Sequence, residues 1–308
     1  MQQPILYIIV LHFGDMNDTL ACLESIHKCI GNNWRRHICV VNNTGSMPRE
    51  NAQKGGTEEW IHAPDNLGYA GGMNLGITRA LENGADYVLL LNNDVVLHPD
   101  ALIEFKNGVA LGSGKGIWGG TIFFRDQPER IWFSGGIIQT WLGRTQHRRQ
   151  GELHDEKWEK PMPVDYITGA MLLVSRAVFE RAGQLDTSLF LYFEDTEFSL
   201  RARRYGFQPT LVPAVRAWHK VGAWQDTESR VRYLYFQTRN RYLVLCGQAP
   251  FLKKLTTRFM HVMVFSLWRA LKTVVGFKPD AVLEARAILR GLRDSLKNVR
   301  GRGEYADV

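Results

Sequence analysis

The sequence predicts an α/β protein with a doubly wound, mostly parallel sheet and a C-terminal helical appendage. Over the first half of the chain, continuous apolar runs typical of strands buried on both faces alternate with amphipathic helical runs. Polar or glycine-rich segments follow the apolar runs, and a basic amphipathic stretch closes the sequence. Alternation of this kind predicts parallel strands joined by right-handed crossovers. We therefore expect one large domain over residues 1–240 and a helical tail over 241–308.

The first 115 residues contain four expected strands and three expected helices. The clearest strands are "ILYIIVLHF" and "DYVLLLNND", which are apolar almost throughout. The expected strands are 5–13, 37–43, 58–64 and 86–94. The expected helices are 18–30, 74–84 and 98–108, the first burying Leu20, Leu23, Ile26, His27 and Ile30.

After residue 115 the apolar runs are shorter and glycines interrupt them. Residues 164–183 predict a strand, a small-residue turn, a second strand and a short helix. Residues 192–206 predict a helix whose acidic start and basic finish favour its dipole. Residues 209–223 predict a strand that leads into a loop.

The net charge of +7 belongs entirely to the tail. Residues 251–308 contain 12 Lys and Arg against 5 Asp and Glu, so the preceding residues are balanced, and we expect no nucleic-acid partner. The first apolar run lacks a basic start and a cleavage site, which indicates a buried strand of a cytoplasmic protein. Four cysteines without CxxC or zinc spacing predict reduced thiols, with Cys22 and Cys29 in the core.

A carboxylate stands where the strand at 86–94 ends. Asp94 follows Asn92 and Asn93, and a hard divalent cation often takes only one or two oxygen ligands from a protein. The same three residues are also favoured in ordinary turns because of their local hydrogen bonds. Both readings remain open on these residues alone.

Two further candidates lie in the second half. Glu194 and Asp195 begin an expected helix, where paired carboxylates either perform acid–base chemistry or cap the helix. His219 in "WHKVGA" either ligates a metal or phosphate or packs in the core.

Five segments follow one another along the chain: "VVNNTGS", "DNLGYAGGMNLGI", "LLLNNDVVLHPDAL", "ITGAMLLVSRAVFERAGQLDTSLFLYFEDTEFSLRARRYGF" and "AWHKVGA". In order and spacing they resemble the inverting family 2 glycosyltransferases of GT-A fold, especially bacterial rhamnosyltransferase-like enzymes. The resemblance covers residues 5 to about 240. It implies a GT-A catalytic domain with a nucleotide-sugar half over 1–115 and an acceptor half over 116–240.

The resemblance also implies roles for single residues. Asp94 would hold Mg²⁺ or Mn²⁺ on the diphosphate of a nucleotide-sugar donor, and His219 would complete the metal site. Asp195 would be the general base that removes the acceptor proton, with Glu194 as the alternative. Asn74 would start the helix after the glycines. The residues implied to bind the donor are Asn42, Asn66, Gly68, Gly71, Gly72, Asn74, Asn92 and Asn93.

Two departures from the family pattern concern the nucleotide. The family usually has Asp where this chain has Asn42, and often Asn-Tyr-Asn where it has "HFG" at 12–14. Among donors we favour dTDP-L-rhamnose over a UDP-hexose, with a glycan or lipid-linked acceptor in surface polysaccharide synthesis. The alternative function is a catalytically inactive module that binds glycans or nucleotide sugars. A dinucleotide-binding oxidoreductase does not fit, because "GYAGGMNLG" follows a third strand and lacks the GxGxxG form.

The basic tail contains two amphipathic runs, 251–277 and 279–302. Charged residues interrupt the first, so no segment of about 20 apolar residues is left to cross a bilayer. The helices either pack on the main domain or on a second copy of the chain, or they bind an anionic membrane surface, which would be the inner face of the plasma membrane. The apolar residues of the first run are Leu252, Leu255, Phe259, Val262, Met263, Leu267, Trp268 and Leu271.

Overall fold

The computed structural model describes residues 3–30, 34–46, 57–139, 142–155, 160–221, 226–246, 251–275 and 280–305. They form two compact units, each with its own core. The first unit comprises Met1–Ile137, His147–Leu185 and Phe198–Val221. The second comprises Ile138–Gln146, Asp186–Glu197 and Gly222–Val308.

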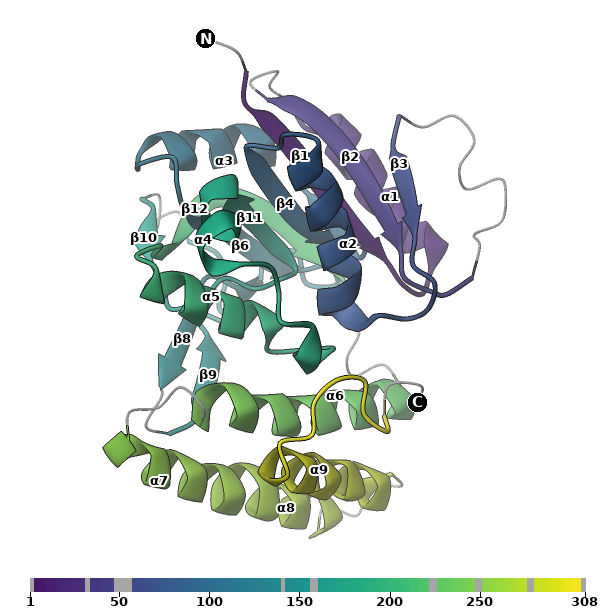
Figure 1. Ribbon diagram of the computed structural model, residues 1–308, viewed down its shortest axis with the longest axis vertical. Coiled ribbons are helices and arrows are strands. Elements are labelled where there is room, and N and C mark those ends of the chain that lie inside the picture. The colour runs from purple at the N-terminus through teal and green to yellow at the C-terminus, as the bar shows by residue number, and fades with distance from the viewer. Residues whose placement is uncertain are drawn as a thin grey trace. The chain divides into compact units, whose positions relative to one another are not determined.

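A ten-stranded mixed sheet is the centre of the first unit (Figure 1). Its order is β10-β12-β6-β11-β4-β1-β2-β3, with β5 paired to β12 and β7 to β6. Strands β4, β1, β2 and β3 are parallel neighbours, which confirms the predicted α/β class. The strands are β1 (Ile5–His12), β2 (Arg35–Asn42), β3 (Glu59–His62), β4 (Tyr87–Asn92), β5 (Val95–Leu97), β6 (Ile117–Phe124), β7 (Ile131–Phe133), β10 (Met162–Pro163), β11 (Met171–Ser175) and β12 (Pro209–His219). A separate two-stranded sheet consists of β8 (Gly136–Gln139) and β9 (Arg144–His147).

Helices cover both faces of the large sheet, with α2 on one side and α1 on the other (Figure 1). The core between them consists of fully buried strand residues such as Ile8, Val10 and Leu90. The helices of the first 204 residues are α1 (Met16–Lys28), α2 (Gly68–Glu82), α3 (Ala101–Ala110), α4 (Arg176–Ala182) and α5 (Glu194–Arg204), with a 3₁₀ turn at Thr187–Leu189.

The buried face of α1 differs from the prediction. Cys22, Leu23 and Ile26 are buried as expected, but Leu20 and Ile30 are 46% and 55% exposed, and His27 is exposed as well. The helix instead buries Thr19, whose hydroxyl is hydrogen-bonded to side chains at the strand ends. A polar contact therefore sets the rotation of the helix, and it leaves Leu20 in water.

Two other expectations are corrected. The helix expected over 74–84 begins six residues earlier, at Gly68, so Asn74 lies within α2 and not at its start. Of the strand expected to begin at residue 164, only an isolated bridge between Tyr166 and Gly136 forms, directly after β10 ends at Pro163. The second strand and the helix of that segment are present as β11 and α4.

The second unit is built mainly from the C-terminal helices, of which α6 and α9 pack against each other. Gly291 of α9 allows this approach, because a Cβ there would lie 2.6 Å from the carbonyl oxygen of Tyr235. The boundary expected near residue 240 stays a prediction. The helices are α6 (Thr227–Arg241), α7 (Phe251–Met260), α8 (Arg269–Val275) and α9 (Ala281–Leu296), with π-helical segments at Tyr242–Cys246 and His261–Trp268.

Candidate functional site

Asp94 and His219, distant in sequence, meet at the carboxyl end of the parallel strands. β4 ends at Asn92, and after a short turn β5 runs antiparallel to β12, which places Val95 opposite His219. As a result Oδ1 of Asp94 lies 3.1 Å from Nε2 of His219. In open α/β sheets, ligands bind beyond this end of the strands.

Several polar atoms at this strand end are buried without a hydrogen-bond partner among the described residues. They are Oδ1 of Asn92, Oδ1 of Asp94 and Nδ1 of His219. Oδ1 of Asp94 is among them because its contact with Nε2 of His219 has the distance but not the geometry of a hydrogen bond. Buried polar atoms are normally paired, so orphaned ones indicate a ligand. Oδ1 of Asp94 and Nε2 of His219, which face each other at 3.1 Å, fit a divalent cation such as Mg²⁺ or Mn²⁺. The described residues contain no group of three or more His, Cys, Asp or Glu that could hold a metal by themselves.

Aromatic side chains form a wall beside His219. The rings of Trp132 and His219 meet edge to face with centroids 4.4 Å apart, and His147 packs in the same way against Trp132 at 4.9 Å. Nδ1 of His147 lies 3.1 Å from the Trp132 carbonyl, and burial lowers the pKa of His147 to about 4. His147 is therefore a neutral packing partner at physiological pH. The sequence gives no local sign of Trp132, because only the pairing of β7 with β6 brings it here.

Asn42 and Asn43 end β2 and organise the loops around them. Nδ2 of Asn43 donates to the Gly68 carbonyl at 3.0 Å, and its Oδ1 accepts from the Leu67 N–H at 3.0 Å. Oδ1 of Asn42 accepts from the N–H and the hydroxyl of Thr44, and its Nδ2 donates to the Ser46 carbonyl. The amide of Asn42 is thus engaged within its own loop and with Nδ1 of His62 on β3 at 3.3 Å, whereas Asn43 fixes the start of α2.

The start of α2 explains the glycines in "DNLGYAGGMNLGI". Gly68 has φ of +71° and donates its N–H to Oδ1 of Asn66 at 3.0 Å. A Cβ at Gly72 would lie 2.5 Å from the Leu11 side chain, and one at Gly71 would lie 2.8 Å from Cβ of Leu67. The glycines therefore let the helix begin close against the carboxyl end of β1.

Asn74 and Asn93 hold neighbouring segments in place. The amide of Asn74 makes two hydrogen bonds with the backbone of Leu185, at 2.9 and 3.1 Å. Nδ2 of Asn93 donates to the Thr19 hydroxyl at 3.0 Å, and that hydroxyl is 2.7 Å from Nδ1 of His12. His12 belongs to "HFG", so this departure from the family pattern lies at the same strand end.

In the second unit, Glu194 and Asp195 form the first turn of α5. Glu194 is 5% exposed, and its Oε2 has no partner among the described residues. Burial, and secondly the charge of Asp195, raise the pKa of Glu194 well above its usual range. Oδ1 of Asp195 accepts from the Thr196 N–H at 2.5 Å and from the Thr196 hydroxyl at 3.1 Å. Glu194 therefore releases its proton less readily than an exposed glutamate does.

The bend before this acidic pair is strained and clamped. Phe190, Tyr192 and Phe193 have positive φ angles of 65°, 65° and 72°, which residues other than glycine rarely adopt. Two buried residues of α6, Arg239 and Asn240, hold the bend. The amide nitrogen of Asn240 donates to the carbonyls of Leu189, Leu191 and Tyr192 at 2.8–2.9 Å, and Arg239 donates to those of Leu189 and Gly301. Sequence reasoning missed both clamp residues, because nothing in α6 alone points to the bend.

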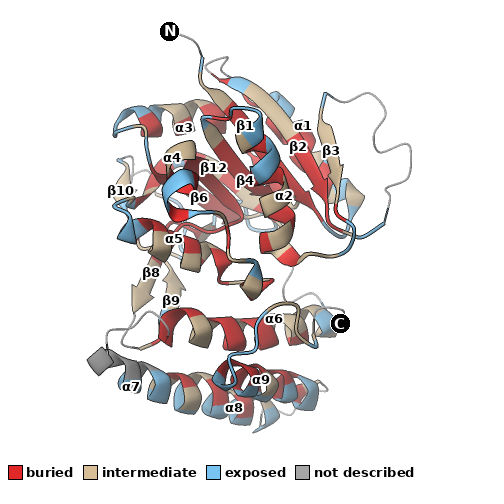
Figure 2. Ribbon diagram, viewed as in Figure 1, coloured by how far each residue is buried: buried red, intermediate tan, exposed pale blue. Residues whose placement is uncertain are grey.

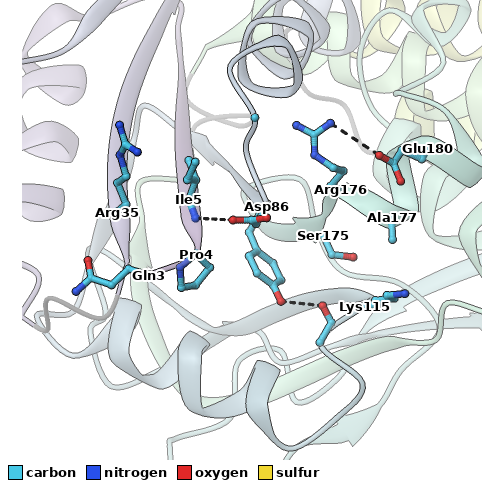
Figure 3. A pocket seen from close by; sticks show the side chains of 13 residues that line it. Gln3, Pro4, Ile5, Arg35, Asp86, Lys115, Ser175, Arg176, Ala177 and Glu180 are labelled. Atoms are coloured by element: carbon cyan, nitrogen blue, oxygen red, sulfur yellow. Dashed lines mark hydrogen bonds and ion pairs between the residues drawn. The ribbon is translucent and has the colours of Figure 1, made fainter. Parts of the chain in front are cut away.

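A polar hollow of about 930 Å³ lies at the opposite, amino end of β1 and β4 (Figure 3). Several of its polar groups are engaged in structural bonds. Asp86 accepts from the Ile5 N–H at 2.8 Å, and Arg176 donates to the Ala85 carbonyl at 2.7 Å. Because ligands of open α/β sheets bind at the other edge, this hollow is not the candidate site.

Residues 4–242 match the family described as "Glycosyltransferase like family 2". Galactofuranosyltransferase GlfT2 of Mycobacterium tuberculosis is 24% identical over 60% of this chain, which spans only 31% of that protein. The dTDP-rhamnosyl transferase RfbF of Shigella flexneri is 24% identical over 78% of this chain and 79% of its own length. The mannosyltransferase PcManGT of Pyrobaculum calidifontis, solved in complex with GDP-Man and Mn²⁺, superposes with a TM-score of 0.54 at 11% identity, over 96% of this chain and 88% of that one.

Proposed function

Because the chain belongs to glycosyltransferase family 2, we propose that it transfers a sugar, with inversion, from a nucleotide-sugar donor to a hydroxyl of a glycan or lipid-linked acceptor. The observation that carries this proposal is the pairing of Asp94 with His219 at the carboxyl end of the sheet, beside orphaned polar atoms. The product would belong to surface polysaccharide synthesis. Among donors dTDP-L-rhamnose is favoured over a UDP-hexose, since RfbF, similar over most of its length, is a dTDP-rhamnosyl transferase.

The donor would lie along the edge formed by the ends of β1, β2 and β4 and the start of α2. Backbone N–H groups at the start of a helix favour phosphate. Gly71 and Gly72 let this start lie close against Leu67 and Leu11, and Asn43 and Asn66 fix its backbone. Asn42, Asn92 and Asn93 would border the same ligand.

Asp94 and His219 would hold Mg²⁺ or Mn²⁺. When bound, such an ion offsets the negative charge that develops on a departing nucleoside diphosphate. With two ligands from the described protein, most of the coordination would come from the diphosphate and water. Trp132 limits the motion of the His219 ring and so keeps Nε2 directed at Asp94.

Asp195 would act as the general base that takes the proton of the acceptor hydroxyl. A base must be ionised, and the raised pKa of Glu194 makes that neighbour the less suitable candidate. The clamp from Arg239 and Asn240 would hold the bend before the pair in one conformation.

The test is a panel of nucleotide sugars, measuring release of the nucleoside diphosphate and sugar transfer with Mn²⁺ and with EDTA. We expect transfer from one donor that needs the ion. Donor binding without any turnover, in the presence of a range of glycan acceptors, would instead favour the inactive binding module.

A further inference from the structure

The burial pattern of α7, α8 and the π segment between them is inverted. Small or polar residues such as His261, Ser266 and Ala270 are buried, while large apolar residues at every fourth position are exposed (Figure 2). In a helix on the surface of a water-soluble protein the apolar stripe faces the core. The exposed residues, called the tail face here, include Leu255, Phe259, Met263, Leu267, Leu271 and Val275.

The π segment helps to make this face continuous. In an α-helix, four residues overshoot one turn by about 40°, so a stripe with this spacing would drift around the helix. A π-helix has a wider turn, and His261–Trp268 adopts it in the middle of the stripe. Met263 and Leu267 therefore stay on the same side as Leu255 and Leu271, as their exposure shows.

Helix α9 has a more ordinary buried face, which contains Ile288 and Leu292 together with small residues such as Gly291. It nevertheless exposes large apolar side chains, among them Leu283 and Leu289. Of the twenty large apolar side chains that are exposed in the described part of the chain, fourteen lie between residues 255 and 299. Scattered exposed apolar residues are ordinary, but a concentration of this kind marks an interaction surface.

The charge around the tail face selects the partner. Residues 251–308 carry 12 basic against 5 acidic residues, and the basic ones include Arg258, Arg269 and Lys272 in the same helices. Nζ of Lys272 lies 5.2 Å from the centre of the Trp268 ring, so cation and aromatic ring are presented together. A second copy of the chain would bring like charges together, whereas an anionic lipid surface offers both an apolar layer and opposite charge.

We propose that the tail face lies in the headgroup layer of an anionic membrane, with its helices parallel to the surface. Among the described residues no helix is long and apolar enough to cross a bilayer. The proposal does not depend on the transfer reaction, because lipid binding needs no substrate.

The full-length protein would be sedimented with phosphatidylcholine vesicles, with and without phosphatidylglycerol, over a range of salt concentrations. We expect binding only to the anionic vesicles, weakened by salt. Leu255→Glu and Leu271→Glu each lose about tenfold or more in affinity, because a charge replaces an inserted apolar group. The control is Leu111→Glu in the first unit, since Leu111 is 75% exposed and Leu255 is 76% exposed. Point variants are preferable to a truncation near residue 248, because the truncation would remove α9 from its contact with α6.

Equal loss in the Leu111→Glu control, or no binding by any form, would overturn the proposal. Light scattering provides the other arm. If the protein is a dimer and Leu255→Glu makes it a monomer, a second copy covers the tail face, and the membrane proposal is overturned.

Discussion

Oδ1 of Asp94 lies 3.1 Å from Nε2 of His219 because β5, directly after Asp94, pairs with the last residues of β12. Neighbouring ligands of an octahedral ion with bonds of about 2.1 Å are separated by about 3 Å, so the two atoms suit one Mg²⁺ or Mn²⁺. Strand pairing, and not local sequence, therefore creates the site. Two protein ligands would hold an ion weakly, so the proposed site would depend on a bound diphosphate for its affinity.

Asp94→Asn is expected to lower metal-dependent turnover by roughly 10²-fold or more, because the amide lacks the charge that holds the ion. In calorimetric titrations with Mn²⁺ and a nucleoside diphosphate, it should also weaken binding of the ion. Glu24→Gln serves as the control, since it removes an exposed carboxylate from α1. Full activity of Asp94→Asn, or of the unaltered protein in EDTA, would contradict the proposed metal site.

Asp195→Asn is expected to lower kcat by roughly 10²–10⁴-fold, the usual contribution of a general base, and to leave donor affinity nearly unchanged. The variant keeps the size of the side chain and its acceptor oxygen for Thr196. Steady-state kinetics with both substrates separate kcat from KM. If Glu194→Gln is inactive and Asp195→Asn is active, the two roles are reversed.

The raised pKa of Glu194 predicts a pH-dependent stability. The folded protein keeps a proton that the unfolded chain releases above about pH 4.3, so Glu194 lowers stability as the pH rises from there toward its folded pKa. Glu194→Gln removes this effect. Its melting temperature relative to the unaltered protein should therefore rise from pH 4 to pH 8. Glu197, a half-buried residue of the same turn, provides the control. If the melting temperature of Glu197→Gln rises in the same way, the effect does not belong to Glu194.

Much of the fold follows from the sequence where a segment is strongly patterned. The parallel strands β1, β2, β3 and β4 form where apolar runs predict them, and the C-terminal helices are present. The GT-A fold implied by the family resemblance agrees with the structural neighbours and with the family match. The roles assigned to individual site residues remain predictions.

The parts that sequence reasoning missed depend on contacts between distant segments. Leu20 is exposed because Thr19 binds groups at the strand ends. Helix α2 begins at Gly68 because Asn66 and Asn43 hold its first residues. Helix propensities do not predict such contacts, because they describe single residues. Trp132 reaches His219 only through the pairing of β7 with β6.

The clamp on the strained bend gives the last prediction. Asn240→Ala removes the donor that serves three carbonyl oxygens, so the bend at Phe190–Phe193 should relax and displace the acidic pair that follows it. We expect kcat to fall by about tenfold or more with KM for the donor unchanged, and stability to fall by about 1–3 kcal/mol, the cost of unpaired buried polar groups.

The matched control is Thr238→Val. Thr238 is a buried residue of α6 whose hydroxyl donates to the Leu234 carbonyl of its own helix. The kcat of Thr238→Val should stay near that of the unaltered protein. If Asn240→Ala is less stable but keeps its kcat, Asn240 does not position the acidic pair, and its contacts with the bend contribute to stability alone. A donor KM that rose with kcat unchanged would place Asn240 at the donor instead of behind the acidic pair.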